Sequence, residues 1–280
     1  MPGPVRVPTQ QVVRDRGRPV GQTVVMRIGV NGAAGRMGQT VCAAVAADPD
    51  LDLVAAVDPS GAGQTVAGVI VADHLHAFSD AGCDVVVDFT VAPAARDTLP
   101  WLGLHGIHAV VGTSGFSDDD FALFESTFGG NGGPNCVIAP NFAISAVLMM
   151  RFAEMAAPYF DTAEIIELHH DRKVDAPSGT AVRTAARIAA ARGGDFDPDP
   201  TVDTVYDGAR GGAGPAGIRV HAVRMRGMVA HQEVILGAEG QTLTIRQDSY
   251  DRSSFMPGVV LACKRIADVP GLSRSLDPFL

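Results

Sequence analysis

The sequence predicts an α/β protein in two parts, a parallel sheet with helices on both faces followed by an α+β part with a mixed sheet. From Met26 onward, short runs rich in valine and isoleucine alternate with longer stretches of helical periodicity. That alternation is typical of right-handed β–α–β crossovers and therefore of a parallel sheet. After about residue 142 it gives way to strand-like runs with short connections, which favour antiparallel or mixed pairing.

The first part is expected to hold buried strands separated by helices. Its apolar runs are nearly continuous, as in sheets that are covered on both faces. Met37, Val41 and Val45 share one face at a spacing of four, which predicts an amphipathic helix after the first strand. Further helices are expected at 92–105 and 117–128. The strands are predicted at 26–32, 51–58, 85–90, 108–115 and 136–141.

The second part begins with a helix and a long strand. A loop follows the strand, and the next helix is ended by Gly193 and Gly194, because glycine terminates helices readily. The Gly- and Pro-rich stretch after it is predicted as a loop, and three strand-like runs then come in close succession. The expected helices are 143–157, 180–192 and a last one near 253–267; the expected loop is 193–218; the expected strands are 164–170, 218–226, 231–238 and 241–247.

Composition excludes several classes of protein. A net charge of −9 over 280 residues argues against nucleic-acid binding, which needs a basic face. No apolar run approaches the roughly 20 residues that cross a bilayer. The four cysteines lie far apart without a CxxC pair, so reduced thiols of a cytoplasmic protein are expected rather than disulfides or zinc. Residues 1–25 lack the apolar segment of a signal peptide, and we expect a flexible extension, or a true start at Met26, outside the fold.

The segment GAAGRMG follows the first strand and opens the first helix. Glycines at Gly32, Gly35 and Gly38 let the backbone approach a pyrophosphate, while the helix N-terminus offers free N–H groups. This is the position of the dinucleotide site in a Rossmann-like domain, although the GxxGxxG spacing alone is weak and the glycines could instead serve helix–sheet packing.

Asp58 ends the second strand, where an acid normally binds the adenosine ribose. A carboxylate repels a ribose phosphate, so NADH is favoured over NADPH, with Arg36 as a possible offsetting charge for NADPH. The alternative is a solvated acid at a strand end.

Two turns, GTS at 112–114 and APNF at 139–142, end the fourth and fifth predicted strands. Ligands lie at this edge of an open α/β sheet, so the turns are candidates to hold the nicotinamide ring and its ribose. Ordinary turn chemistry would also explain these residue types.

The segment EIIELHHDRKVDAPSGTA, residues 164–181, concentrates acid–base and anion-binding residues. His169, His170 and Lys173 can exchange protons, and Asp175 could orient Lys173 or stiffen the loop. Ser178 is expected to cap the following helix, so that the amides of Gly179 and Thr180 cradle a carboxylate. Structural histidines and a plain helix cap are the alternatives. A metal site is not expected, because no cysteine or third histidine lies at ligand spacing.

The same segment resembles the signature of the dihydrodipicolinate reductase family. GAAGRMG, VVDFTV, VVGTSGF, APNFAISAVLMM and VHAVRMRGMVAHQEV are similar to that family too, so the resemblance runs from Met26 to about Ile266. It implies NAD(P)H-dependent reduction of 4-hydroxy-tetrahydrodipicolinate, a small cyclic dicarboxylate, with loss of water in lysine and diaminopimelate biosynthesis.

The resemblance also implies roles for particular residues. His169 matches the family's proton donor and acceptor, Lys173 its proton donor, and His170, Gly179 and Thr180 its substrate contacts, beside Ser178. The implied cofactor contacts are Gly32, Ala33, Ala34, Gly35, Arg36, Met37, Asp58, Gly112, Thr113, Ser114, Ala139, Pro140, Asn141 and Phe142.

The resemblance further implies a domain arrangement and an assembly. It gives a dinucleotide-binding domain at 26–141 that the C-terminal segment 250–280 completes, and a substrate-binding and oligomerisation domain at 142–249. The sheets of the second domain are expected to assemble a homotetramer.

The sequence departs from the family pattern at Arg172 and Gln247, where histidine is common, and this puts the charge of the substrate pocket in doubt. Another amino-acid-pathway dehydrogenase with a thiol nucleophile remains an alternative, although Cys136 begins a strand rather than ending one. A non-catalytic dinucleotide-binding sensor is the other alternative, and in it His169 and Lys173 would be dispensable.

Overall fold

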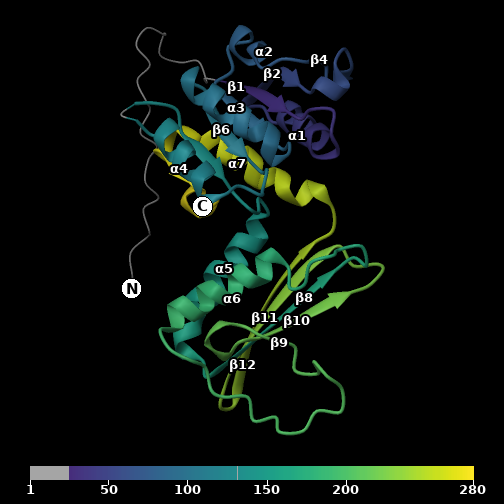
Figure 1. Cartoon of the computed structure of the whole chain (residues 1–280), viewed down its shortest axis with the longest axis vertical. Coiled ribbons are helices and arrows are strands. Elements are labelled where there is room, and N and C mark those ends of the chain that lie inside the picture. The colour runs from purple at the N-terminus through teal and green to yellow at the C-terminus, as the bar shows by residue number, and fades with distance from the viewer. Residues whose placement is uncertain (1–24, 131) are drawn as a thin grey trace, which may run out of the picture.

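The computed structural model of the chain describes residues 25–130 and 132–280. The extension expected at 1–25 therefore lies, apart from Val25, outside the described residues. Two sheets build the molecule, and Figure 1 shows the first with its helices above the second. The expected α/β fold, with a parallel Rossmann-like sheet and a second mixed sheet, is confirmed.

The first sheet has the strand order β13-β7-β6-β5-β1-β2-β4-β3 and is parallel except for the β3–β4 pair. The chain leaves β1 to one side for β2 and later returns to its other side for β5. Such a reversal opens a crevice at the carboxyl ends of the strands, where ligands bind. The strands are β1 Met26–Asn31, β2 Leu51–Val57, β3 Thr65–Val66, β4 Val69–Ala72, β5 Val85–Asp88, β6 His108–Val111, β7 Cys136–Ile138 and β13 Leu272–Ser273.

Helices cover both faces of this sheet, as the buried strands predict. Val41, Cys42 and Val45 of the first helix are buried against it, on the face that the spacing of Met37, Val41 and Val45 indicates. The helices of this part are α1 Arg36–Ala47, α2 His76–Asp80, α3 Ala92–Leu104, α4 Asp118–Thr127 and α7 Met256–Arg265.

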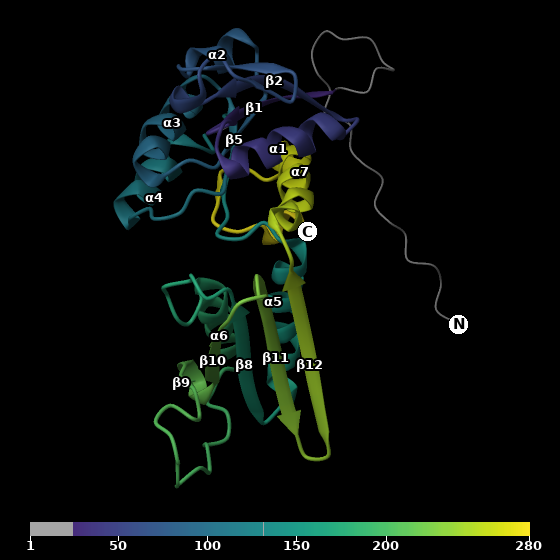
Figure 2. The same cartoon turned by 90° about the vertical axis from the view of Figure 1, so that its right-hand side faces the viewer.

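The second sheet has the order β12-β11-β8-β10-β9 and is mixed, with β8 and β10 parallel and the other neighbours antiparallel. Two helices pack along one of its faces (Figure 2). The elements are β8 Thr162–His169, β9 Gly212–Ala213, β10 Arg219–Arg224, β11 Ala230–Ala238, β12 Gln241–Ser249, α5 Ile144–Ala156 and α6 Gly179–Arg192.

The C-terminal segment returns to the first sheet. Figure 2 shows α7 beside α1, and β13 pairs with β7 at the sheet edge. At Gly258 the helix approaches so closely that a Cβ atom would lie 2.0 Å from the Phe142 carbonyl oxygen. Only glycine fits there.

An ionic cluster ties the end of the chain to the helices of the second sheet. Asp277 accepts hydrogen bonds of 3.0 and 3.1 Å from Arg187 of α6 and lies 3.3 Å from Arg151 of α5. Arg187 also donates to Glu154 at 3.0 Å. The α6 helix is thus fixed to the C-terminal segment.

Short elements are the main difference from the sequence-based expectation. The strands β3, β4, β9 and β13 and the helix α2 were not predicted, since two to five residues carry too little periodicity. All four cysteines are buried and unpaired. Among the described residues, no helix combines the length and the hydropathy of a membrane span.

Candidate active site

The glycine turn between β1 and α1 borders a cavity of about 590 Å³ at the carboxyl ends of β1, β2 and β5. Gly32 adopts a φ of +76°, which favours glycine. A Cβ atom on Gly38 would lie 2.0 Å from the Gly32 carbonyl oxygen, so the turn packs directly on the helix. Gly32, Gly35 and Asp58 line the cavity. The volume lies within the range of ligand pockets, and the exposed backbone at a helix N-terminus can bind a phosphate group.

Asp58 also braces the glycine turn. Its carboxylate accepts hydrogen bonds from the amide of Ala34 at 3.1 Å and from the amide and hydroxyl of Ser60 at 2.9 and 2.6 Å. A carboxylate has about four acceptor positions, so one remains for a ribose hydroxyl. Asp58 therefore stabilises the turn and keeps one acceptor position that no group of the described chain occupies.

Asp88, at the end of β5, organises the strand ends from beneath. It is fully buried and accepts hydrogen bonds from Asn31 at 2.8 Å, from the Thr90 amide and hydroxyl at 3.0 and 2.8 Å, and from Thr113 at 2.8 Å. These donors come from the ends of β1, β5 and β6. No local sequence pattern indicates a role for Asp88, because its partners lie up to 57 positions away.

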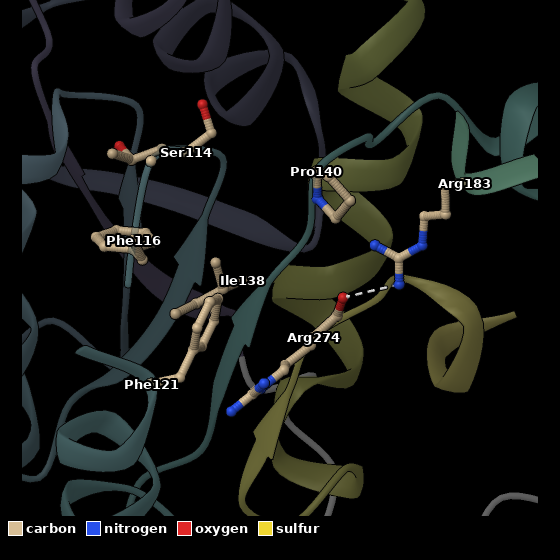
Figure 3. A pocket seen from close by; sticks show the side chains of 9 residues that line it. Ser114, Phe116, Phe121, Ile138, Pro140, Arg183 and Arg274 are labelled. Atoms are coloured by element: carbon tan, nitrogen blue, oxygen red, sulfur yellow. Dashed lines mark hydrogen bonds between the residues drawn. The ribbon is translucent and has the colours of Figure 1, made fainter. Parts of the chain in front are cut away.

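The turns after β6 and β7 flank an apolar cavity of about 310 Å³ (Figure 3). Phe116, Phe121 and Ile138 form its wall, and the Arg274 guanidinium lies 4.1 Å from the centre of the Phe121 ring. Arg183 reaches this cavity from α6 and donates to the Arg274 carbonyl oxygen at 3.4 Å. A residue of α6 thus reaches the edge of the first sheet at which β6 and β7 end.

A third cavity, of about 340 Å³, lies between the two domains. Ser114, Pro140 and Asn141 line it from the first domain, and five of the predicted site residues line it from the second. Met150 and Arg183, which the sequence did not single out, complete the lining. The five residues are His169, Lys173, Ser178, Gly179 and Thr180.

The imidazole of His169 is held at the end of β8. Its Nδ1 lies 2.5 Å from a carboxylate oxygen of Glu167, while Nε2 has no hydrogen-bond partner in the described chain. Burial lowers the pKa of His169, and the charges of Lys173 and Arg224 act in the same direction, against the raising effect of Glu167. The ring is consequently neutral near pH 7, with one nitrogen available.

Lys173 is only partly exposed, and its ammonium nitrogen lies 2.8 Å from Asp175. The same ion pair lowers the pKa of Asp175, so this carboxylate stays charged and orients the lysine. The expected pairing of Lys173 with Asp175 is what the structure shows.

The N-terminus of α6 faces the same cavity. Ser178 caps the helix, since its hydroxyl oxygen accepts a hydrogen bond from the Ala181 amide at 3.2 Å. The amides of Gly179 and Thr180 have no acceptor within the described part of the chain. Free amides at a helix N-terminus bind anions such as carboxylates.

Other predicted site residues lie outside these cavities. Phe142 is buried, with its ring centre 5.8 Å from that of Phe89, and it lines none of the three cavities. His170 directly follows the last residue of β8 and lines none of the three cavities, and its buried Nδ1 has no hydrogen-bond partner among the described residues. The remaining residues that line none of the three cavities are Ala33, Ala34, Arg36, Met37, Gly112 and Ala139.

A parallel nucleotide-binding sheet, facing an imidazole, an ammonium and a helix N-terminus on a second domain, defines a two-domain dinucleotide-dependent oxidoreductase. The chain belongs to the dihydrodipicolinate reductase family. Residues 26–142 match the family model described as dihydrodipicolinate reductase, N-terminus, and residues 145–279 match the one described as dihydrodipicolinate reductase, C-terminus.

Relatives agree with this assignment. The 4-hydroxy-tetrahydrodipicolinate reductase of Nocardia farcinica is 51% identical over 92% of this chain and 99% of its own length. That of Streptomyces coelicolor is 49% identical over 91% and 98%. A solved dihydrodipicolinate reductase from Paenisporosarcina sp. TG-14, with dipicolinate bound, superposes with a TM-score of 0.81 at 36% identity, over 91% of this chain and 100% of that one. A scyllo-inositol dehydrogenase from Lactobacillus casei, with a TM-score of 0.61, 12% identity, and coverage of 92% and 93%, shares the fold alone.

Proposed function

We propose that this chain reduces 4-hydroxy-tetrahydrodipicolinate to tetrahydrodipicolinate with NAD(P)H and loss of water, in lysine and diaminopimelate biosynthesis. The observation that carries the proposal is the interdomain cavity, in which His169, Lys173 and the α6 N-terminus face the turns of the nucleotide-binding edge. The relatives' shared activity and the dipicolinate in one of them support a ring dicarboxylate as substrate.

The residues of the second domain bind the substrate and move its protons. The amides of Gly179 and Thr180, with Ser178, grip one ring carboxylate, and His170 is a further contact. Loss of water takes the hydroxyl group from one ring carbon and a proton from its neighbour, which leaves a double bond between them. A bound dihydronicotinamide would supply a hydride to the carbon that carried the hydroxyl group. Lys173 donates the proton that the adjacent carbon takes up, and the free His169 nitrogen exchanges a proton with the reacting ring.

The first domain is proposed to hold the cofactor. Asp58 would bind the adenosine ribose, and the turns 112–114 and 139–142 the nicotinamide end, with 32–37 at the pyrophosphate. Asp58, Asp73 and Asp97 line the large cavity, and none of its described lining residues is a lysine or an arginine. Such a surface repels a ribose phosphate, which supports NADH as the preferred cofactor. No step requires a metal.

The two alternatives from the sequence have less support. A thiol nucleophile would need a reactive cysteine at the cavity, but Cys136 is buried and burial raises its pKa well above the usual range. In one cavity, Asp175 orients Lys173 and Glu167 orients His169. A sensor that only binds a dinucleotide would not need these oriented side chains. We therefore favour the reductase.

A homotetramer in the cytoplasm is part of the proposal. The face of the second sheet away from α5 and α6 is free of described helices (Figure 2). Ile166, Leu168 and Ile235 are half-buried there, and strand partners place them on one surface. Pairing of such faces would build the assembly, and light scattering measures it directly.

A coupled assay tests the activity. The purified chain is mixed with synthase-generated substrate and with NADH or NADPH, and oxidation of the cofactor is followed. We expect turnover with both and a higher kcat/KM with NADH. Cofactor binding without turnover would favour the sensor, and a preference for NADPH would contradict the role given to the acids of the cavity.

A further inference from the structure

We propose that Glu167 is the positioning residue of this active site, fixing the proton-transfer nitrogen of His169 and the anion cradle of α6 through one carboxylate. This inference rests on the proposed function for its catalytic consequence. Its structural content is independent of that function. Glu167 touches neither proposed ligand and lines none of the cavities described above.

The carboxylate lies at the crossing of several elements. Glu167 is fully buried on β8, two residues before His169, so both side chains leave the same face of the strand. One carboxylate oxygen lies 2.5 Å from Nδ1 of His169, and the other accepts the amide of Ser178 at 3.0 Å. Ser178 is the cap of α6. A single side chain therefore sets the positions of the histidine and the helix end.

Arg224 holds the carboxylate in place. It pairs with His169 in the β8–β10 register and donates two hydrogen bonds to Glu167, at 2.8 and 2.7 Å, one to each oxygen. This two-pronged geometry fixes a carboxylate in orientation as well as position. Arg224 also donates to the carbonyl oxygen of Asp175 at 2.7 Å, which ties down the loop that carries Lys173.

The charge of Glu167 determines which His169 nitrogen carries the proton. Burial acts to raise the pKa of Glu167, but hydrogen bonds from Arg224, His169 and the Ser178 amide outweigh it, and the net pKa is lowered. A charged carboxylate can only accept hydrogen bonds. Nδ1 of His169 must then be the protonated nitrogen, which leaves Nε2 as the free one.

The charges that face His169 are those of Glu167, Lys173 and Arg224. Glu167 raises the pKa of the ring, whereas both cations lower it. Loss of the Glu167 charge would therefore move the pKa of His169 further down. The limb of the pH–rate profile that His169 governs should move to lower pH.

The test is Glu167→Gln, which keeps the shape and removes the charge. We expect kcat to fall roughly 10- to 100-fold, the loss seen when partners that orient metal-binding histidines are removed, with the His169 limb shifted to lower pH and NADH binding unchanged. Glu164→Gln is the matched control. Glu164 lies on the same strand and also pairs with an arginine and a histidine, but on the opposite face, and its variant should keep the wild-type profile.

A second measurement needs neither turnover nor a variant that folds. Long-range ¹H–¹⁵N spectra of the wild-type enzyme should show His169 with its proton on Nδ1. A proton on Nε2 would overturn the proposal, as would a Glu167→Gln enzyme with wild-type kcat and pH profile. If the wild-type chain showed no turnover, the proposed function would be wrong. The tautomer of His169 would still show whether Glu167 positions its ring.

Discussion

Two fully buried carboxylates, Asp88 and Glu167, occupy equivalent places in the two domains but have opposite kinds of partners. Each lies at the carboxyl end of an inner strand of its sheet, beside a cavity wall. Asp88 accepts only from uncharged groups, those of Asn31, Thr90 and Thr113. Glu167 accepts from a guanidinium, an imidazole and a backbone amide.

The difference in partners implies two different roles: Asp88 fixes the position of the turns, whereas Glu167 also affects the protonation of a histidine. The partners of Asp88 do not titrate near neutral pH, so this carboxylate can only fix the turns where the cofactor is proposed to bind. Glu167 is hydrogen-bonded to a histidine that can gain or lose a proton, so its influence reaches proton transfer. Variants in the two regions should therefore fail in different ways.

The largest effect is expected at the proposed acid–base pair. His169→Ala or Lys173→Ala removes a group that exchanges a proton, and such losses lower kcat by about 10²- to 10⁴-fold. Steady-state kinetics measures the loss, and NADH titration should show nearly unchanged binding, because neither side chain lines the glycine-turn cavity. Wild-type turnover in either variant would show that the residue takes no part in the mechanism. The two domains would then not differ in their effect on proton transfer.

Asp88→Asn is expected to affect stability and cofactor binding rather than pH dependence. The amide can accept at one oxygen only, so donors among Asn31, Thr90 and Thr113 lose their acceptor in the core. An unsatisfied buried polar group costs about 1–3 kcal/mol, measurable by denaturant unfolding. NADH should bind more weakly as the turns loosen. A shifted pH–rate profile with unchanged stability would contradict the purely structural role.

The sequence predicted the larger elements because their side chains carry the signal. Buried apolar runs located β1, β2, β5, β6 and β7 to within a few residues. The third run was expected to extend to residue 90, but β5 ends at Asp88, whose carboxylate accepts the Thr90 amide and turns the chain. β13 has only two residues and is a strand because it pairs with β7. The paired residues Leu272 and Cys136 are 136 positions apart, so no local pattern predicts this strand.

The site was predictable to the extent that its residues are chemically distinctive. His169, Lys173 and the Ser178–Thr180 cap stand out in sequence, and the structure gathers them in one cavity. Glu167 lies inside the same segment, but no local pattern distinguishes it, because its importance depends on Arg224, 57 residues away. Two acids on one strand, Glu164 and Glu167, look alike until the sheet assigns them to opposite faces.

The smallest of these effects is expected at Gly179. Its substitution tests the anion cradle at the N-terminus of α6, which Glu167 is proposed to position. A Cβ atom there would meet no protein atom within 4 Å, so Gly179→Ala should fold normally, and alanine is also the better helix former. The added methyl group would stand at the anion cradle, raising KM for the substrate about tenfold, or roughly 1.4 kcal/mol, with kcat and NADH binding little changed. Gly194→Ala, just beyond the other end of α6 and equally free of contacts, is the control and should leave all of these values unchanged. An unchanged KM in Gly179→Ala would mean that the carboxylate binds elsewhere, and Glu167 would then position the histidine alone.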